Sequence, residues 1–261
     1  MLDPSPKTLR LGVLTPSSNT ALEPLTSALV ASYRQGTPLA DAGAVTAHYA
    51  RFKVTEIGLN HQALNQFDDS HILAAADLLA DAKVDVIGWS GTAAGWLGFE
   101  KDRRLVEKIE QRTGIAATTA VLALNDALAL RGVQRIAIAS PYTADVQQQI
   151  ADNYARAGIQ VVAETHEGIR DNHQFGMLEP ALLAQRLRQL AQHEQRPQAL
   201  ITYCTNLRAA QLAPALEAEF GIPLLDTVST TVWGMLRRAQ WPTQPLAPWG
   251  MLFAQAQPVK V

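Results

Sequence analysis

The sequence predicts an α/β protein of two pseudo-symmetric lobes, each a mainly parallel sheet flanked by helices, with the active site between the lobes. Two observations lead to this prediction. Short apolar segments of strand type alternate with helical patterns along the 261 residues, which is typical of parallel sheets covered by helices on both faces. Residues 201–206 also repeat the layout of residues 86–94, which indicates an internal duplication.

Each copy of the duplicated unit is an apolar run that breaks at a small polar turn and leads into a helical pattern, at Phe99–Arg112 and at Arg208–Phe220. Each helical pattern ends at a glycine, after which another apolar strand follows. Cys204, the only cysteine of the chain, lies in the second copy, and Gly91 holds the equivalent position in the first. We therefore expect a site between the two copies.

The other elements are predicted from apolar periodicity and from turn residues. Gly132 follows a helical pattern and suits a left-handed cap, and the proline-rich tail from Gln240 to Trp249 predicts irregular chain packed on the surface. Strands are expected at Leu9–Leu14, 44–50, Val84–Trp89, around Ile115, 134–139, 159–163, immediately before Cys204 and around Ile222, and helices at Ala21–Tyr33, His61–Lys83, 119–131, 144–157, 179–194 and 227–239, besides the two named above.

The duplication divides the chain into two lobes. Residues 1–118, completed by the last helix and the tail at 226–261, form the first lobe, and residues 119–225 form the second. A chain of this length can bury a core large enough for stability without cross-links.

Composition and charge exclude several classes of function. A single cysteine excludes an internal disulfide and a thiolate zinc cluster, and it fits a reducing cytoplasm. The net charge of −2 gives no electrostatic reason to expect nucleic acid or an anionic membrane as a partner. Met1–Lys7 is not a signal peptide, and no apolar run approaches the roughly 20 residues of a membrane span. We expect a soluble cytoplasmic protein, and a homo-oligomer is compatible with the sequence.

No cofactor and no metal are predicted. His166 and His173 are seven residues apart in a loop, without the spacing of a metal site. The chain also lacks the Gly-x-Gly-x-x-Gly pattern and the phosphate loop of nucleotide-binding proteins.

Polar residues follow several predicted strands, and ligands of open α/β sheets bind beyond the carboxyl ends of the strands. The turn Pro16–Asn19 is a good helix entry, but free N–H groups and an amide at a helix start also suit a carboxylate. Cys204 is either a small buried apolar residue or a reactive thiol. The residues expected to face one cleft are Asn19, Arg51, Gly91, Thr92, Tyr142, Asn172 and Cys204.

Four segments together carry a resemblance to known proteins: Leu11–Asn19, Ser140–Tyr142, Ile169–Asn172 and Tyr203–Cys204. Through them the chain resembles the maleate cis-trans isomerases and arylmalonate decarboxylases of the aspartate/glutamate racemase superfamily. The likeness covers nearly the whole chain. It implies a cofactor-independent enzyme that binds a small carboxylate substrate between its lobes.

The resemblance also implies roles for single residues. In the isomerases a first-lobe cysteine is the nucleophile that adds to the maleate double bond, and Gly91 stands in its place here. The decarboxylases pair a first-lobe glycine with a second-lobe cysteine, as this chain does. Thr92 and Tyr142 match a threonine and a tyrosine that hold carboxyl groups in the decarboxylases, whereas Ala93 replaces their serine. The chain keeps the Pro-Ser-Ser-Asn turn, which the decarboxylases lack.

Chemistry favours a decarboxylase of a small, malonate-type dicarboxylate. Isomerisation or racemisation needs a group at position 91 that glycine cannot supply, whereas loss of carbon dioxide needs donors for the enediolate oxygens and one acid. Cys204 is the predicted proton donor, assisted by Thr92 and Tyr142. Substrate binding is assigned to Ser17, Ser18, Asn19, Gly91, Ala93, Asn172, Thr205 and Asn206, and the pocket is expected to be lined by Trp89, Trp96, Leu97 and Phe175.

Two alternatives stay open. One is a maleate isomerase or racemase-like enzyme that works without the first-lobe cysteine. The other is an inactive carboxylate-binding protein.

Overall fold

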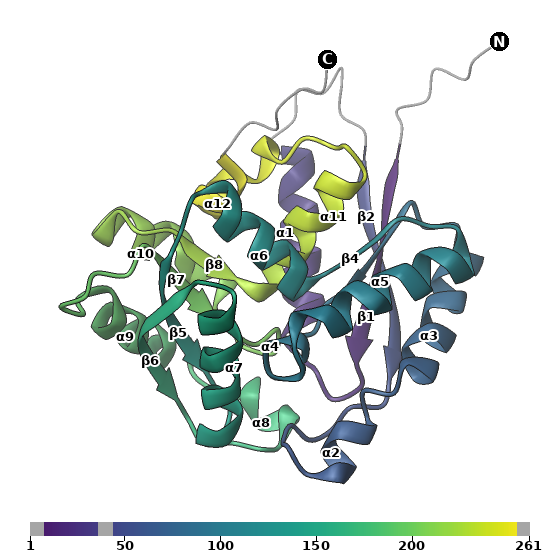
Figure 1. Cartoon of the computed structure of the whole chain (residues 1–261). Coiled ribbons are helices and arrows are strands. Elements are labelled where there is room, and N and C mark those ends of the chain that lie inside the picture. The colour runs from purple at the N-terminus through teal and green to yellow at the C-terminus, as the bar shows by residue number, and fades with distance from the viewer. Residues whose placement is uncertain (1–7, 36–43, 255–261) are drawn as a thin grey trace.

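A computed structural model describes residues 8–35 and 44–254 of the chain. Within them, two four-stranded parallel sheets have the orders β2-β1-β3-β4 and β6-β5-β7-β8 (Figure 1). The two orders are identical when the halves of the chain are matched strand by strand. The prediction of two α/β lobes of like construction is therefore confirmed, and β3 and β7, which carry the duplicated segment, occupy equivalent places.

The element bounds follow the predicted alternation closely. The strands are β1 (Leu9–Pro16), β2 (Val45–Phe52), β3 (Val86–Trp89), β4 (Ala117–Thr119), β5 (Arg135–Ser140), β6 (Gln160–His166), β7 (Ala199–Thr202) and β8 (Leu224–Asp226). The helices are α1 (Leu22–Gln35), α2 (His61–Asn65), α3 (Asp69–Asp81), α4 (Ala94–Leu97), α5 (Phe99–Thr113), α6 (Ala120–Leu130), α7 (Ala144–Arg156), α8 (Asn172–Phe175), α9 (Pro180–Ala191), α10 (Ala213–Phe220), α11 (Thr227–Arg238) and α12 (Met251–Ala254), with 3₁₀ helices η1 (Ala210–Leu212) and η2 (Gln244–Trp249).

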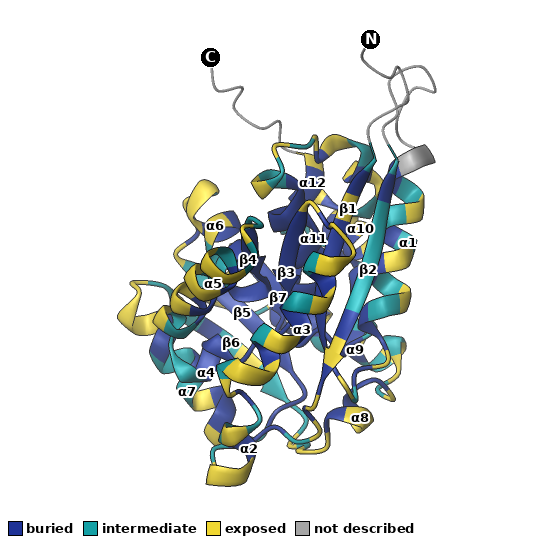
Figure 2. Cartoon of the chain, turned by 90° about the vertical axis from the view of Figure 1, so that its right-hand side faces the viewer, coloured by how far each residue is buried: buried dark blue, intermediate teal, exposed yellow. Residues whose placement is uncertain are grey.

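The central strands β3 and β7 are buried along their whole length because helices cover both faces of each sheet. All four residues of β3 and all four of β7 are buried, whereas β2, at the edge of its sheet, is only partly buried. Figure 2 shows this contrast, with β3 and β7 in dark blue and much of β2 in teal. The outer faces of α3 and α5 are yellow, which marks exposed residues. The core therefore lies between the sheets and their covering helices.

Glycines end the helices where the sequence predicts it. Gly114 and Gly221 cap α5 and α10 in the left-handed conformation, with φ values of 70° and 66°. Gly132 follows α6 with φ of 60°, as a left-handed cap requires. The strands after Gly114 and Gly221, expected around Ile115 and Ile222, begin two residues later, at Ala117 and Leu224.

The long helix expected at His61–Lys83 is wrong, because the chain forms α2 and α3 instead. The cause is a second helix start: the Asp68 carboxylate accepts the N–H of Ser70 and so caps α3. The helix expected from Arg208 likewise begins only at Ala213, after the 3₁₀ turn η1, and carries proline in its first turn.

The tail from Gln240 to Trp249 is only partly as the sequence predicts. Several of its residues are exposed at the surface, as expected, but Gln244–Trp249 forms η2 and Leu246 is buried. Beyond the tail, Leu252 and Phe253 of α12 are also buried. Since η2 contacts α1 and α10, and α12 contacts α10 and α11, these apolar side chains contribute to the core.

The division into lobes gains support from α11, which contacts β3 and β4 of the first sheet. We propose on this basis that the last helix belongs with the first lobe, although α6, assigned to the second, also packs against α11. Residues 1–7 and 255–261, which the prediction assigns to the first lobe, lie outside the described residues. No helix in the described part of the chain is long and apolar enough to cross a membrane.

Asp226 links β8 to α11 and yields a test of the fold. Its carboxylate accepts the N–H groups of Val228 and Ser229 at 2.9 and 3.1 Å and the Thr202 hydroxyl at 2.6 Å. Asp226→Ala should lower the free energy of unfolding by about 1–2 kcal/mol through loss of the cap. Asp226→Asn keeps an acceptor and should lose less, so equal losses in urea unfolding would contradict the capping role.

Candidate active site

A pocket lies where the carboxyl ends of strands from both sheets meet. Its walls come from the turns after β1, β3, β5 and β7, from the chain after β2 and from α8. The space between its walls is about 290 Å³ when the open solvent at its mouth is counted. The lining residues are Pro16, Val54, Ile57, Phe67, Trp89, Gly91, Thr92, Ala93, Trp96, Tyr142, Asn172, Cys204 and Thr205.

A pair of hydroxyl groups joins the two lobes inside this pocket. Thr92 follows β3 and Tyr142 follows β5, and their hydroxyl oxygens are 2.7 Å apart. Burial raises the pKa of Tyr142 well above its ordinary value, and nearby Cys204 adds to the rise. The rings of Trp96 and Phe175 hold the phenol by edge-to-face contacts, with centroids 5.3 and 5.5 Å away. Tyr142 therefore stays neutral and keeps its proton for donation.

The Cys204 thiol is buried at the end of the turn after β7, and only 3% of the residue is exposed. Burial raises the pKa of the thiol to about 12, although the Tyr142 hydroxyl and the Asn206 N–H, 3.4 Å from Sγ, lower it in part. At neutral pH the group is a thiol and not a thiolate. It is thus suited to giving a proton and poorly suited to nucleophilic attack.

Gly91 is the counterpart of Cys204 in the first lobe. Gly91 lies two residues beyond the end of β3, as Cys204 lies two residues beyond the end of β7, and both residues line the pocket. The first lobe therefore contributes no side chain where the second contributes a thiol. Ala93, which also lines the pocket, adds only a methyl group.

The turn after β1 is fixed by the neighbouring loops. The hydroxyls of Ser17 and Ser18 donate to the carbonyl of Val54, at 3.2 and 2.5 Å. The Asn172 amide donates to the Ser18 hydroxyl at 2.7 Å. Asn172 belongs to the second lobe and lines the pocket, so this bond brings its side chain to the first-lobe wall.

Asn19 caps α1 and reaches the second lobe. Its side-chain oxygen accepts the N–H groups of Ala21 and Leu22 at 3.1 and 2.9 Å. Its amide donates to the Thr205 hydroxyl at 3.2 Å, and that hydroxyl donates to the carbonyl of Ser90 at 3.0 Å. The predicted helix entry is therefore present, and the amide is bonded within the protein.

Asn206 makes a second link between the lobes. Its side-chain oxygen accepts the N–H groups of Thr20 and Ala21 at 2.9 and 3.0 Å, and its amide donates to the carbonyl of Asn172 at 2.5 Å. The sequence predicts that N–H groups at the start of α1 are free to bind a carboxylate. In the structure the N–H groups of Thr20 and Ala21 instead have partners within the protein.

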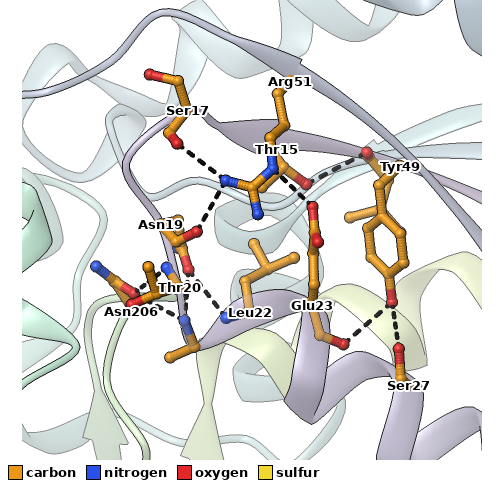
Figure 3. A network of polar contacts seen from close by, with 12 residues as sticks. Thr15, Ser17, Asn19, Thr20, Leu22, Glu23, Ser27, Tyr49, Arg51 and Asn206 are labelled. Carbon is orange, nitrogen blue, oxygen red and sulfur yellow. Dashed lines mark hydrogen bonds and ion pairs between the residues drawn. The ribbon is translucent and has the colours of Figure 1, made fainter.

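Arg51 supports this turn from outside, as Figure 3 shows. Its guanidinium donates to the carbonyls of Ser17 and Asn19 at 2.9 and 3.1 Å and pairs with Glu23 at 2.9 Å. Arg51 was expected to face the cleft, but it is exposed and not among the residues that line the pocket. Its role here is to hold the turn.

The predicted site residues separate into two groups. Gly91, Thr92, Ala93, Tyr142, Asn172, Cys204 and Thr205 line the pocket, whereas Ser17, Ser18, Asn19 and Asn206 are not among the lining residues and brace them through the bonds above. Direct binding of a substrate by either group stays a prediction.

Four wall residues were expected from position alone. Trp89 and Trp96 line the pocket, whereas Leu97 and Phe175 do not; Phe175 instead packs behind Tyr142. The apolar wall formed by Val54, Ile57 and Phe67 is not predicted from the sequence. These residues lie in short segments around β2 and α2, where nothing in the pattern separates a pocket wall from the core.

The site offers no evident set of metal ligands. Within residues 8–35 and 44–254, no three His, Cys, Asp or Glu side chains gather as a metal site requires. His166 pairs with Glu164 at 3.0 Å instead.

Comparison with known proteins places this site in a family. A family model described as arylmalonate decarboxylase matches residues 29–252. The chain belongs to the arylmalonate decarboxylase family. The arylmalonate decarboxylase of Bordetella bronchiseptica is 22% identical over 172 residues, which cover 66% of this chain and 72% of that protein.

Other relatives of this arylmalonate decarboxylase family member carry a different activity in their names. The maleate isomerase of Geobacillus stearothermophilus is 24% identical over 237 residues, which cover 88% of this chain and 92% of that protein. The crystal structure of a maleate isomerase from Pseudomonas putida S16 matches with a TM-score of 0.87 and 24% sequence identity. The match covers 96% of this chain and 100% of that protein's chain. This structural likeness supports the fold.

The buried thiol of this family member gives a direct test of the site's electrostatics. In the native protein at pH 8.5, Cys204 should react with iodoacetamide at least about 100-fold more slowly than in denaturant, because a pKa of about 12 leaves little thiolate. Mass spectrometry of the single cysteine measures both rates. Equal rates would show that the thiol is exposed or ionised, and Cys204→Ser supplies the unlabelled control.

Proposed function

We propose that this protein is a cofactor-independent enzyme that removes one carboxyl group from a small, malonate-type dicarboxylate and protonates the product from Cys204. The observation that carries the proposal is the pocket's single thiol, which is buried and kept protonated by a pKa of about 12, while the equivalent position of the first lobe is a glycine. One proton donor without a partner base or nucleophile suits a reaction that needs one proton.

The reaction balances with the residues at hand. The bond between the central carbon and one carboxyl group breaks, carbon dioxide leaves, and the electron pair passes into the remaining carboxyl group as an enediolate. Cys204 then gives its proton to the carbon, and the thiolate recovers a proton from water. No external oxidant or reductant takes part.

The hydroxyl pair of Thr92 and Tyr142 is suited to donating a hydrogen bond to an enediolate oxygen. Their hydroxyls lie 2.7 Å apart, so one of them donates to the other and one hydroxyl hydrogen remains for the substrate. Because both side chains are buried, this donor acts in a site with little water, where a hydrogen bond to a developing negative charge is most effective.

Isomerisation of maleate is the second candidate, and overall likeness to curated relatives favours it over decarboxylation. The Geobacillus relative named maleate isomerase aligns with 88% of the chain, and the Bordetella relative named arylmalonate decarboxylase with 66%. In this chain the adduct would have to form on Cys204, the only cysteine. A buried thiol that stays protonated is a poor nucleophile, and the raised pKa of Cys204 therefore supports decarboxylation.

Turnover assays separate the candidates. In deuterated water, phenylmalonate and methylmalonate should release carbon dioxide and give a product with one deuterium on the α-carbon. Cys204→Ala should lower kcat by roughly 100- to 10,000-fold, the usual contribution of a general acid. Conversion of maleate to fumarate without carbon dioxide would establish the isomerase instead, and binding without turnover would establish a carboxylate-binding protein.

The hydroxyl pair gives a further prediction. Tyr142→Phe should lower kcat by roughly 100-fold with a smaller change in KM, because the lost donor acts mainly on the charge that develops in the transition state. Tyr154→Phe is the matched control, since Tyr154 is equally buried, donates to Asn125 at 3.1 Å and is not among the residues that line the pocket. Equal effects of the two substitutions would remove Tyr142 from the mechanism.

A further inference from the structure

Trp89 fills the space that a side chain at position 91 would need. Trp89 is the last residue of β3, and Gly91 lies two residues beyond it. A Cβ atom added to Gly91 would lie 2.0, 2.4 and 2.5 Å from Cζ2, Cη2 and Cε2 of the Trp89 indole. Non-bonded carbon atoms rest at about 3.5–4.0 Å, so the indole occupies this space.

The indole has little freedom to move aside. Trp89 is 1% exposed, and its ring lies against that of Phe52, with centroids 5.0 Å apart. The three atoms nearest to the added Cβ belong to one rigid ring system. Relief of the contact therefore requires displacement of the whole side chain within a packed core.

We propose that Trp89 is a specificity-determining residue that closes the first-lobe face of the pocket, so that only glycine fits at position 91 and only Cys204 can exchange a proton with the substrate. The steric part of this proposal stands on the contact geometry alone. Its catalytic part rests on the proposed function. Residues 89 and 91 then form a coupled pair, and a thiol on the first lobe requires both to change.

The catalytic consequence concerns the handedness of the product. With one thiol, the proton always enters from the Cys204 side and a prochiral substrate gives one enantiomer. With a second thiol at position 91, the α-proton of the product can pass to one sulfur, present as thiolate, while the other sulfur gives its proton to the opposite face. One proton leaves and one arrives, nothing is oxidised, and the product racemises.

The steric part is tested by a double-mutant cycle in thermal unfolding. Gly91→Cys should lower the melting temperature by about 5 °C or more, as overpacking of a core does, whereas in the Trp89→Leu background the same substitution should cost less than half as much. Gly91→Ala, which adds only the Cβ, provides a second cycle if the cysteine variant does not fold. The proposal would be overturned if the Trp89→Leu background lowered the loss of melting temperature in neither cycle. It would also be overturned if the substitutions at Gly91 caused no loss in the protein that retains Trp89.

Gly95 supplies the matched control for this cycle. A Cβ there would lie 2.4 Å from the Tyr203 hydroxyl, a contact of similar severity that does not involve Trp89. Trp89→Leu should leave the cost of Gly95→Ala unchanged. Relief at Gly95 as well would mean that Trp89→Leu merely loosens the core, and this would also overturn the steric claim.

The catalytic part has a separate readout. An optically pure α-methyl arylacetate in deuterated water should lose optical purity and gain deuterium with Trp89→Leu/Gly91→Cys at least about 10-fold faster than with either single variant. Equal racemisation by Gly91→Cys alone would overturn the role of Trp89. A cycle that shows relief, in a protein that does not decarboxylate any malonate, would uphold the steric claim and refute the proposed function instead.

Discussion

The pocket depends on hydrogen bonds that tie the turn after β7 to the start of α1. The Asn206 oxygen accepts the N–H groups of Thr20 and Ala21, and the Asn19 amide donates to Thr205. Because Cys204 directly precedes these two second-lobe residues, the bonds that join the lobes also set where the thiol stands relative to the first lobe. The bonds of Ala21 and Thr205 are buried and therefore costly to leave unmade. The reaction the site can perform thus follows from how the two sheets are held together.

Much of the fold could be predicted because its signals are local. Strands and helices differ in apolar period, and Gly114 and Gly221 end equivalent helices, so the duplication is visible in the residues themselves. The break between α2 and α3 was missed because the Asp68 cap lies within an otherwise continuous Ala/Leu pattern. The burial of Leu246 and Phe253 is not predicted for a different reason, because it depends on tertiary packing: η2 contacts α1, far away in sequence, and α12 packs against α10 and α11.

The site was predictable in outline and not in its contacts. Strand ends placed Gly91, Tyr142 and Cys204 around one pocket, since parallel strands present their carboxyl ends at the same edge. The sequence places residues 89 and 91 near the same strand end, but it does not show that the indole lies over the glycine, because this contact depends on the side-chain conformation of Trp89. Asn19 illustrates the same limit, because an amide at a helix start suits a ligand or a neighbouring loop equally well until its partners are known.

The position of α11 has a consequence for how the chain is made. This helix is the last long one, yet it contacts β3 and β4, and a Cβ at Gly88 would lie 2.5 Å from Met235 Sδ. During synthesis at about 5–20 residues per second, the strands of the first sheet leave the ribosome on the order of 10 s before the helix that covers one of their faces. In that interval one face of the first sheet lacks the helix that later covers it. A chain cut off before α11 would therefore expose the apolar residues of β3 on that face, while α3 and α5 still pack against the sheet.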